Sequence, residues 1–337
     1  MTEVVTLRSM CLATLFGLLT CPLRAIVVAS GDPNASSVLV VYNEVVDGVN
    51  LSGVVMLTTS TGYGCSGSLL PDGLSILTAA HCVSEPSVPS SINIYFQGPS
   101  DSSVVYTSST YLVDPGWTGD ATEGNDLAII RLSQPAPSYD ARYSLFTGIP
   151  TTSPILMAGY GYGGTGTTGA CPWSGYETTC NADGPYYPFG TLRQGQNRYD
   201  AYGSAVGWSA NLLVGDFDNG TETNNALGPT DSDISNEVDI SPGDSGGPSF
   251  YDGLLIGVHD LIGCFSDPDN PNNCAVPPSV NTANDSYFGQ IFADTSVSAY
   301  ASWIESEEVP EPASCSLVLV GLAVAGFLGN STSRRPS

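Results

Sequence analysis

The sequence predicts an all-β fold, because turn-forming residues divide it into short segments. Its 337 residues include 38 glycines and 24 prolines, and serine and threonine are abundant. An apolar run from Leu254 to His259 follows Tyr251-Asp252-Gly253, the pattern of a strand that leaves a tight turn. No heptad or other repeat period appears. Short strands are therefore expected to form most of the body.

One helix is expected where the body ends. Residues 296–305 carry apolar side chains at helical spacing, and Asp294-Thr295 can cap the first turn. The apolar face consists of Val297, Tyr300, Ala301 and Ile304. We interpret this face as core packing.

A candidate nucleophile, Ser245, lies in the glycine-rich segment from Pro242 to Pro248. A serine hydroxyl becomes reactive when a base removes its proton and fixed N–H donors receive the charge that develops on the attacked carbonyl. Gly243 lacks a Cβ and can turn its N–H toward the same point as that of Ser245. We therefore predict Ser245 as the nucleophile and Gly243 with Ser245 as the oxyanion hole.

The order of the candidate triad residues distinguishes two classes of hydrolase. The nucleophile elbow of an α/β-hydrolase requires its acid and then its histidine after the serine. His259 does follow Ser245, but it lies in the predicted strand. His81 and Asp126 both precede the serine, and Asp126 stands at the start of an apolar strand. The order His81, Asp126, Ser245 is that of the chymotrypsin type.

Several segments resemble the trypsin-like (chymotrypsin-fold) serine proteases over about residues 37 to 305. They are Cys65 to Leu70, Thr78 to Cys82, Asn125 to Ala128 and Gly243 to Pro248. The resemblance implies two antiparallel six-stranded β-barrels, with His81, Asp126 and Ser245 in the cleft between them. It implies an endopeptidase that hydrolyses a protein or peptide substrate through an acyl-enzyme, with no cofactor. The alternative is a catalytically silent surface or matrix-binding protein on the same fold.

The resemblance also bears on specificity. Asp239 lies six residues before Ser245, where members that cleave after Arg or Lys carry the acid at the base of the pocket, so Asp239 is a candidate substrate-binding residue. Asp260-Leu261-Ile262 departs from the Ser-Trp-Gly that usually lines that pocket. Ile262 could narrow the entrance.

Six cysteines remain in the body, an even number that suggests disulfides in an exported chain. The resemblance implies a bridge between Cys65 and Cys82, whereas Cys171–Cys180 and Cys264–Cys274 are suggested by proximity. Ser241 occupies the position of a further family cysteine. No Cys-x-x-Cys spacing indicates zinc. Residues 216–220 fall short of the EF-hand spacing, so we expect a hairpin turn there and no metal site.

The charge excludes a nucleic-acid role. The net charge is −25, from 33 acidic residues against eight arginines, and the chain contains no lysine. Such a surface repels phosphates and anionic membranes. A high negative charge favours solubility in an extracellular or salty setting.

The N-terminal segment, residues 1–29, is expected to be a signal peptide. Arg8 precedes an apolar run from Met10 to Leu19, which is too short to span a bilayer as a helix. Cleavage after Ala29 follows a small-residue rule, and the protease domain then comprises residues 30–305. The alternative is cleavage after Ala25, which exposes Ile26; the resemblance implies that such an amine inserts beside Asp244.

The C-terminal end is expected to be a sorting or anchor segment. A linker at 306–312 contains Pro310-Glu311-Pro312. Residues 313–337 are expected to form a hydrophobic helix, uncharged from Ala313 to Gly329, with a basic end at Arg334-Arg335. This arrangement resembles the PEP-CTERM sorting signal of Gram-negative bacteria, which an exosortase-type enzyme removes. A plain membrane anchor is the alternative. The protein is thus expected at the cell surface or outside it, after transient attachment to the inner membrane through the C-terminal helix.

Overall fold

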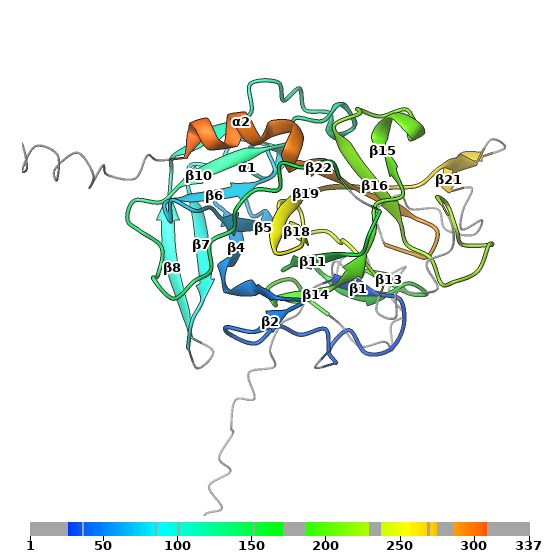
Figure 1. The fold of residues 1–337 in the computed structure, drawn as a ribbon, viewed down its shortest axis with the longest axis horizontal. Coiled ribbons are helices and arrows are strands. Elements are labelled where there is room, and N and C mark those ends of the chain that lie inside the picture. The colour runs from blue at the N-terminus through cyan, green and yellow to red at the C-terminus, as the bar shows by residue number, and fades with distance from the viewer. Residues whose placement is uncertain are drawn as a thin grey trace, which may run out of the picture.

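Two seven-stranded antiparallel sheets form the body of the protein in a computed structural model (Figure 1). The structure describes residues 26–35, 37–84, 86–99, 102–150, 152–170, 187–228, 237–267, 270–274 and 286–308. The predicted all-β class is confirmed. The signal peptide up to residue 25, the Cys171–Cys180 pair and the segment 313–337 lie outside the described residues.

The first sheet has the strand order β8-β7-β4-β5-β6-β10-β9. Its core side chains alternate along the strands, as in β7, where Ile92, Ile94 and Phe96 are fully buried and the residues between them are only partly buried. The members are β4 (Val54–Thr59), β5 (Gly64–Leu69), β6 (Ser75–Thr78), β7 (Ile92–Gln97), β8 (Ser103–Ser108), β9 (Tyr111–Val113) and β10 (Ala128–Arg131).

The second sheet has the order β14-β11-β18-β19-β22-β16-β15. Its members are β11 (Ile155–Gly159), β14 (Arg193–Asn197), β15 (Ala201–Tyr202), β16 (Leu212–Asp216), β18 (Pro248–Tyr251), β19 (Leu254–Gly263) and β22 (Ile291–Ser296). The predicted turn joins β18 to β19, because Asp252 and Gly253 adopt φ values of 50° and 77° that suit a two-residue hairpin.

Each sheet has one strand more than the six that the resemblance implies. The additional strands are β9 and β15, of three and two residues, and both lie at a sheet edge. An edge position requires pairing on one side only, so a few extended residues suffice to add a strand.

A smaller sheet contains the first residues that the structure describes. Its order is β13-β12-β1-β17, with β1 (Ile26–Val28) parallel to β12 and antiparallel to β17. The neighbours are β12 (Gly163–Thr165), β13 (Gly169–Ala170) and β17 (Val238–Asp239). Two further hairpins pair β2 (Val45–Val46) with β3 (Val49–Asn50) and β20 (Ser266–Asp267) with β21 (Asn270–Cys274).

The predicted C-terminal helix is α2 (Val297–Glu307), which packs against β19. All four side chains of its predicted apolar face are buried. The predicted cap was wrong: Asp294 and Thr295 belong to β22, and Ser296 is the N-cap residue. Asp294 is instead bound inside the core by Tyr199 and Ser249. The remaining helical turns are α1 (His81–Ser84), η1 (Leu51–Gly53), η3 (Ala121–Glu123) and η4 (Gly203–Val206).

One apolar cluster joins the two sheets. It combines Leu77 and Ile129 from the first sheet with Phe250 and Val258 from the second, and Ile304 of α2 packs into it. All five side chains are buried, so the two sheets share a core beneath the cleft between them. Among the residues that the structure describes, no helix is long and apolar enough to cross a membrane.

Candidate active site

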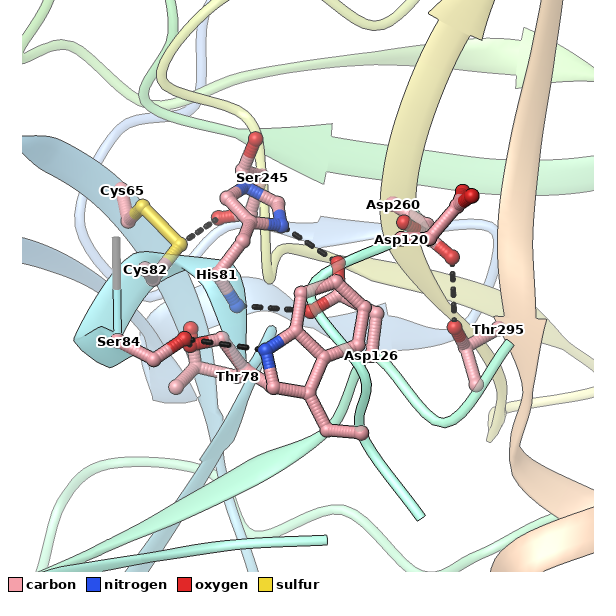
Figure 2. A network of polar contacts seen from close by, with 12 residues as sticks. Cys65, Thr78, His81, Cys82, Ser84, Asp120, Asp126, Ser245, Asp260 and Thr295 are labelled. Atoms are coloured by element: carbon pink, nitrogen blue, oxygen red, sulfur yellow. Dashed lines mark hydrogen bonds and ion pairs between the residues drawn. A yellow bond between two sulfur atoms is a disulfide. The ribbon is translucent and has the colours of Figure 1, made fainter. Parts of the chain in front are cut away.

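His81 and Asp126 meet because their strands are paired. Thr78 of β6 and Ala128 of β10 are Cα partners in an antiparallel pair. His81 follows Thr78 by three residues and Asp126 precedes Ala128 by two, so both residues lie at the same end of the sheet. His81 Nδ1 lies 2.5 Å from Asp126 Oδ2, and the His81 backbone N–H donates to Asp126 Oδ1 at 2.8 Å (Figure 2).

Asp126 is ionised despite its burial. Its side chain is fully buried, and burial alone would raise the pKa of this carboxyl. The charge of His81 and the hydrogen bonds from His81 and from Asp260 outweigh burial, and they hold the pKa of Asp126 below its ordinary value. The buried Asp126 carboxylate thus faces Nδ1 of His81, whose side chain is 21% exposed.

The loop that contains Asp126 is fixed by α2. The backbone N–H of Asn125 donates to the Tyr300 hydroxyl at 3.0 Å, and the Asn125 side chain donates to Asp114 at 2.8 Å. Asn125 adopts a φ of 63°, which asparagine tolerates better than most residues. The C-terminal helix therefore helps to position the acid of the site.

Ser245 lies beside His81 on the wall of one cavity of about 420 Å³ (Figure 2). It comes from the loop before β18, and the first sheet holds that loop in place. Ser66 of β5 donates from its backbone to the Ser245 carbonyl at 2.8 Å and from its hydroxyl to the Gly243 carbonyl at 2.9 Å. The structure thus brings the three predicted triad residues to one place, although Ser245 belongs to the second sheet.

The backbone of this loop presents two N–H groups to the cavity. Gly243 has a φ of 98°, and a Cβ there would lie 2.6 Å from the Phe189 ring, so only glycine fits. In the described part of the chain, the N–H groups of Gly243 and Ser245 have no acceptor, whereas those of Asp244 and Gly246 are both hydrogen-bonded. The two free donors are those predicted for the oxyanion hole.

Asp244 points away from the cavity into the protein. Its carboxylate accepts hydrogen bonds from the Gly161 N–H at 2.7 Å, and from the N–H and hydroxyl of Ser241 at 2.9 and 2.8 Å. Burial nevertheless raises the pKa of Asp244 above its ordinary value. The Asp244 carboxylate therefore anchors the loop between Gly243 and Ser245 from inside the protein.

The predicted disulfide between Cys65 and Cys82 is present, with an S–S distance of 2.02 Å. It joins β5 to the residue after His81, and Cys82 Sγ lies 3.6 Å from the Ser245 carbonyl oxygen. A bridge that closes such a loop typically contributes about 3 kcal/mol. Cys264 is also disulfide-bonded, and its pairing with Cys274 stays a prediction.

Asp239 lies apart from the residues that line this cavity. It belongs to β17, pairs with Val27 of β1 and is fully buried. Among the described residues, neither of its carboxylate oxygens has a hydrogen-bond partner of good geometry. Burial raises the pKa of Asp239 well above its ordinary value. Its predicted role in substrate binding stays a prediction.

Comparison with known proteins identifies the family. The family model for trypsin matches residues 48–286, which is most of the chain. The chain belongs to the trypsin family. Among solved structures it is similar to neuropsin, a serine protease expressed in the limbic system of mouse brain. The two share 17% identity over 76% of this chain and 93% of that chain, with a TM-score of 0.51. This likeness confirms the predicted chymotrypsin-type fold. A search of curated proteins finds no significant match.

A second family model matches the C-terminus of this trypsin-family protein. The PEP-CTERM protein-sorting motif covers residues 308–335. This match confirms the predicted sorting signal and indicates export and surface sorting in a Gram-negative bacterium.

Two residues of the site depart from the trypsin-family pattern, and sequence reasoning assigned no role to either. Ser241, which replaces a family cysteine, binds Asp244. Asp260, which replaces a family serine, lies against Asp126, and its hydrogen bond is one of those that lower the pKa of that residue. Each departure was visible in the sequence, but only the fold reveals which carboxylate it faces.

Proposed function

We propose that the protein is an exported serine endopeptidase. The observation that carries this proposal is that His81, which is bound to the buried Asp126, lines the same cavity as Ser245 and Gly243. Among the described residues, the backbone N–H groups of Gly243 and Ser245 have no acceptor. Membership of the trypsin family supports it. The proposed catalytic residues are His81, Asp126 and Ser245, with Gly243 and Ser245 as the oxyanion hole.

The proposed reaction proceeds by acyl transfer. Asp126 holds the Nδ1–H of His81, so that Nε2 is free to take the proton of the Ser245 hydroxyl. The Ser245 oxygen bonds to the substrate carbonyl carbon, and the carbonyl electron pair moves to the oxygen, which faces the N–H groups of Gly243 and Ser245. The tetrahedral intermediate collapses as the C–N bond breaks, and His81 protonates the departing amine. Water then repeats the sequence on the acyl-enzyme and restores the serine.

We also infer that the mature chain begins at Ile26 rather than Ser30. Ile26 and Val27 are fully buried, and cleavage after Ala29 would remove the strand between β12 and β17. Ile26 has a φ of 69°, a conformation that costs a β-branched residue about 1–2 kcal/mol. Hydrolysis of the preceding peptide bond releases this strain.

A free Ile26 amine would have an anion nearby. Ile26 pairs with Gly163 of β12, two residues beyond Gly161, whose N–H binds the Asp244 carboxylate. An ammonium group at this end of β1 would place a positive charge beside the buried Asp244 carboxylate. N-terminal sequencing of the secreted protein tests this inference: a start at Ile26 supports it, and a start at Ser30 excludes it.

Specificity is proposed from two features of the site. The cavity beside Ser245 is lined by the aromatic rings of Tyr63, Tyr162 and Phe189, which favour an apolar side chain of the substrate. Asp239 stays the candidate for binding an Arg or Lys side chain, although it is fully buried and is not among the residues that line this cavity. A peptide library decides this point, because a preference for small apolar residues at the cleavage site would rule out Asp239.

The proposed site of action is the cell surface. The PEP-CTERM motif implies processing by an exosortase-type enzyme after transient insertion of the C-terminal segment into the inner membrane. Mass spectrometry of the mature C-terminus tests this: loss of Arg334 and Arg335 from surface protein is expected, and their retention would refute it.

Hydrolysis of a peptide library by the mature protein tests the activity itself. The wild type is expected to cleave, and cleavage should weaken at acid pH as His81 becomes protonated. The matched control is Ser245→Ala purified in the same way. Equal cleavage by both proteins would show that Ser245 is not the nucleophile.

A further inference from the structure

Asp260 is a buried acid in the candidate active site that the proposed reaction does not use. It lies in β19 of the second sheet, is 5% exposed, and faces Asp126, which lies in the loop before β10 of the first sheet (Figure 2). Ligand atoms of His81, Asp126 and Asp260 all lie within 4.8 Å of one another. Two carboxyl groups thus share one buried space beside the histidine.

Two buried carboxylates at this separation cannot both be ionised, because like charges in a desolvated site repel strongly. At least one proton must therefore remain on the pair. A proton placed between the two groups makes one of them a hydrogen-bond donor to the other, whereas two carboxylates are acceptors only.

The hydrogen-bond donors around the pair decide which group keeps the proton. Asp126 accepts from the backbone N–H of His81 and lies against its ring Nδ1, so its negative charge is well stabilised. Among the described residues, the one donor to Asp260 is the Thr295 hydroxyl, at 2.9 Å from Oδ2. Within the described chain, no donor reaches Asp260 Oδ1. The proton therefore belongs on Asp260.

The other charged and titratable groups around Asp260 favour the same assignment. Asp126 and Asp294 of β22 both repel a charge on Asp260, and the Tyr300 hydroxyl of α2 offers no positive charge. The exposed Asp120, which caps η3 beside β19, adds another carboxylate to this network. His81 is the basic group on this side, and its Nδ1 already lies against Asp126. Burial, followed by Asp126, raises the pKa of Asp260 well above its ordinary value.

We propose that Asp260 is a neutral carboxylic acid whose Oδ1–H donates a hydrogen bond to the Asp126 carboxylate, making it a positioning residue for the His81–Asp126 pair. The proposal rests on the proposed function of this site. Asp260 fixes Asp126 from the opposite sheet and leaves a single negative charge beside His81. The family pattern has a serine here, which also carries a hydroxyl proton but does not ionise in the physiological range.

Asp260→Asn tests the protonation state without relying on activity. Asparagine keeps the shape and a donor but has no ionisable proton. The chain has only two histidines, so the ring nitrogens of His81 can be followed by NMR titration of protein labelled in its histidines, with His259→Gln for assignment. The background is Ser245→Ala, which prevents self-digestion.

The titration has two informative outcomes. If Asp260 is neutral, Asp260→Asn removes no charge, and the His81 titration midpoint stays within about 0.3 pH unit of its parent. If Asp260 is ionised, the same substitution removes a negative charge beside the imidazolium, and the midpoint falls by about one unit or more. The second result would overturn the proposal.

Infrared difference spectroscopy reads the same proton directly. At pH 8, the parent minus Asp260→Asn difference should contain the carbonyl stretch of a protonated carboxylic acid, which shifts in D₂O. Asp120→Asn is the matched control, because that exposed carboxylate is ionised and should contribute no such band. Absence of the band from the Asp260→Asn difference overturns the proposal, whether or not the protein cleaves peptides.

The positioning role is tested by Asp260→Leu, which keeps the volume and removes the donor. We expect kcat to fall about 10- to 100-fold with KM unchanged, and Asp260→Asn or Asp260→Ser to restore most of it. If Asp260 were merely structural, Asp260→Leu would change the midpoint of unfolding, but kcat would not fall at constant KM and Asp260→Asn or Asp260→Ser would not restore it. An undiminished kcat in folded Asp260→Leu would overturn the positioning role. If the parent itself cleaves nothing, the proposed function fails, and the titration and infrared results still decide the state of Asp260.

Discussion

The two histidines of this protein form similar pairs with aspartate in very different surroundings. His81 Nδ1 lies 2.5 Å from Asp126, and His259 Nδ1 lies 2.9 Å from Asp294. The first histidine borders the cavity, whereas both side chains of the second pair are fully buried. A histidine bound to a carboxylate is therefore not sufficient for catalysis. The two sites differ in whether Nε2 of the histidine is accessible to a substrate.

The serines near the two pairs differ in the same way. Ser249 is buried and donates its hydroxyl proton to Asp294, at 2.5 Å, rather than to the histidine. The Tyr199 hydroxyl donates to the same oxygen at 2.6 Å. Ser245 instead lines the cavity beside His81, next to two free backbone donors. We call His259, Asp294 and Ser249 the closed site, because all three are buried. We call His81, Asp126 and Ser245 the open site, because His81 and Ser245 line the cavity.

The largest expected effect is on catalysis at the open site. Ser245→Ala should reduce kcat by about 10⁶-fold, because the remaining residues have no nucleophile to activate. Ser249→Ala is the matched change at the closed site and should leave kcat unchanged while lowering the free energy of unfolding by about 1 kcal/mol. Rate measurements and urea unfolding of both variants check this. A loss of activity in Ser249→Ala alone would reverse the assignment of the two sites.

Removal of the buried histidine should mainly affect stability. His259→Leu removes the ring nitrogen that is bound to Asp294 in a fully buried site, so the free energy of unfolding should fall by about 3 kcal/mol. His81→Leu also removes a partner of a buried carboxylate, but its ring is 21% exposed and borders the cavity, so water can take its place beside Asp126. The free energy of unfolding should therefore change less, while activity disappears. The two unfolding midpoints in urea make the comparison. A His81 variant that is the less stable of the two would contradict it.

A buried acid outside both sites extends the comparison through pH. Asp140 is buried, and neither of its carboxylate oxygens has a hydrogen-bond partner among the described residues. Burial raises its pKa to about 7. The folded protein therefore binds this proton more tightly than the unfolded chain does. The resulting stability is fully present below about pH 4 and is lost as the pH rises through about 7.

Asp140→Asn should remove this dependence. The variant is expected to be more stable than the wild type by about 2–4 kcal/mol at pH 8 and little different at pH 4. Thermal unfolding at the two pH values measures the difference. The exposed Asp120→Asn serves as the control and should have little effect at either pH. A stabilisation that is equal at both pH values would show that Asp140 does not titrate in this range.

The smallest expected effect concerns the support of the open site by α2. Tyr300→Phe removes the hydroxyl that accepts from the Asn125 N–H and the Asn211 side chain. The unfolding free energy should fall by about 1 kcal/mol, and kcat should fall several-fold because Asp126 follows Asn125 directly. Tyr202→Phe, at an exposed tyrosine of β15, is the control. Equal kcat values in the two variants would show that the contact between α2 and Asn125 does not affect catalysis.

The parts of the site that depend on short sequence motifs could be predicted from the sequence. The residues around His81, Asp126 and Ser245 each occur in a short segment with a distinctive pattern, and their order along the chain selected the fold. The apolar face of α2 followed from helical spacing, and the Asp252-Gly253 turn followed from its residue types. Such signals lie within a few residues of one another, so no tertiary information is required to read them.

The parts that depend on pairing between distant strands could not be predicted. Asp294 has the residue type of a helix cap, but its strand register places it in the core beside His259. Asp260 is an ordinary acid in the sequence, and only the packing of β19 against the loop before β10 brings it to Asp126. The same limit applies to Ile26, whose burial follows from its position between β12 and β17.

The reactivity of Ser245 is tested most directly by labelling the mature protein with a fluorophosphonate and locating the adduct by mass spectrometry. The label is expected on Ser245 and on no other serine, at a rate that falls when His81 is replaced by alanine. Ser249 supplies the internal comparison, since its hydroxyl is buried and bound to Asp294. A folded wild-type protein that takes up no label at Ser245 would contradict the proposed activity and leave an exported trypsin-family scaffold.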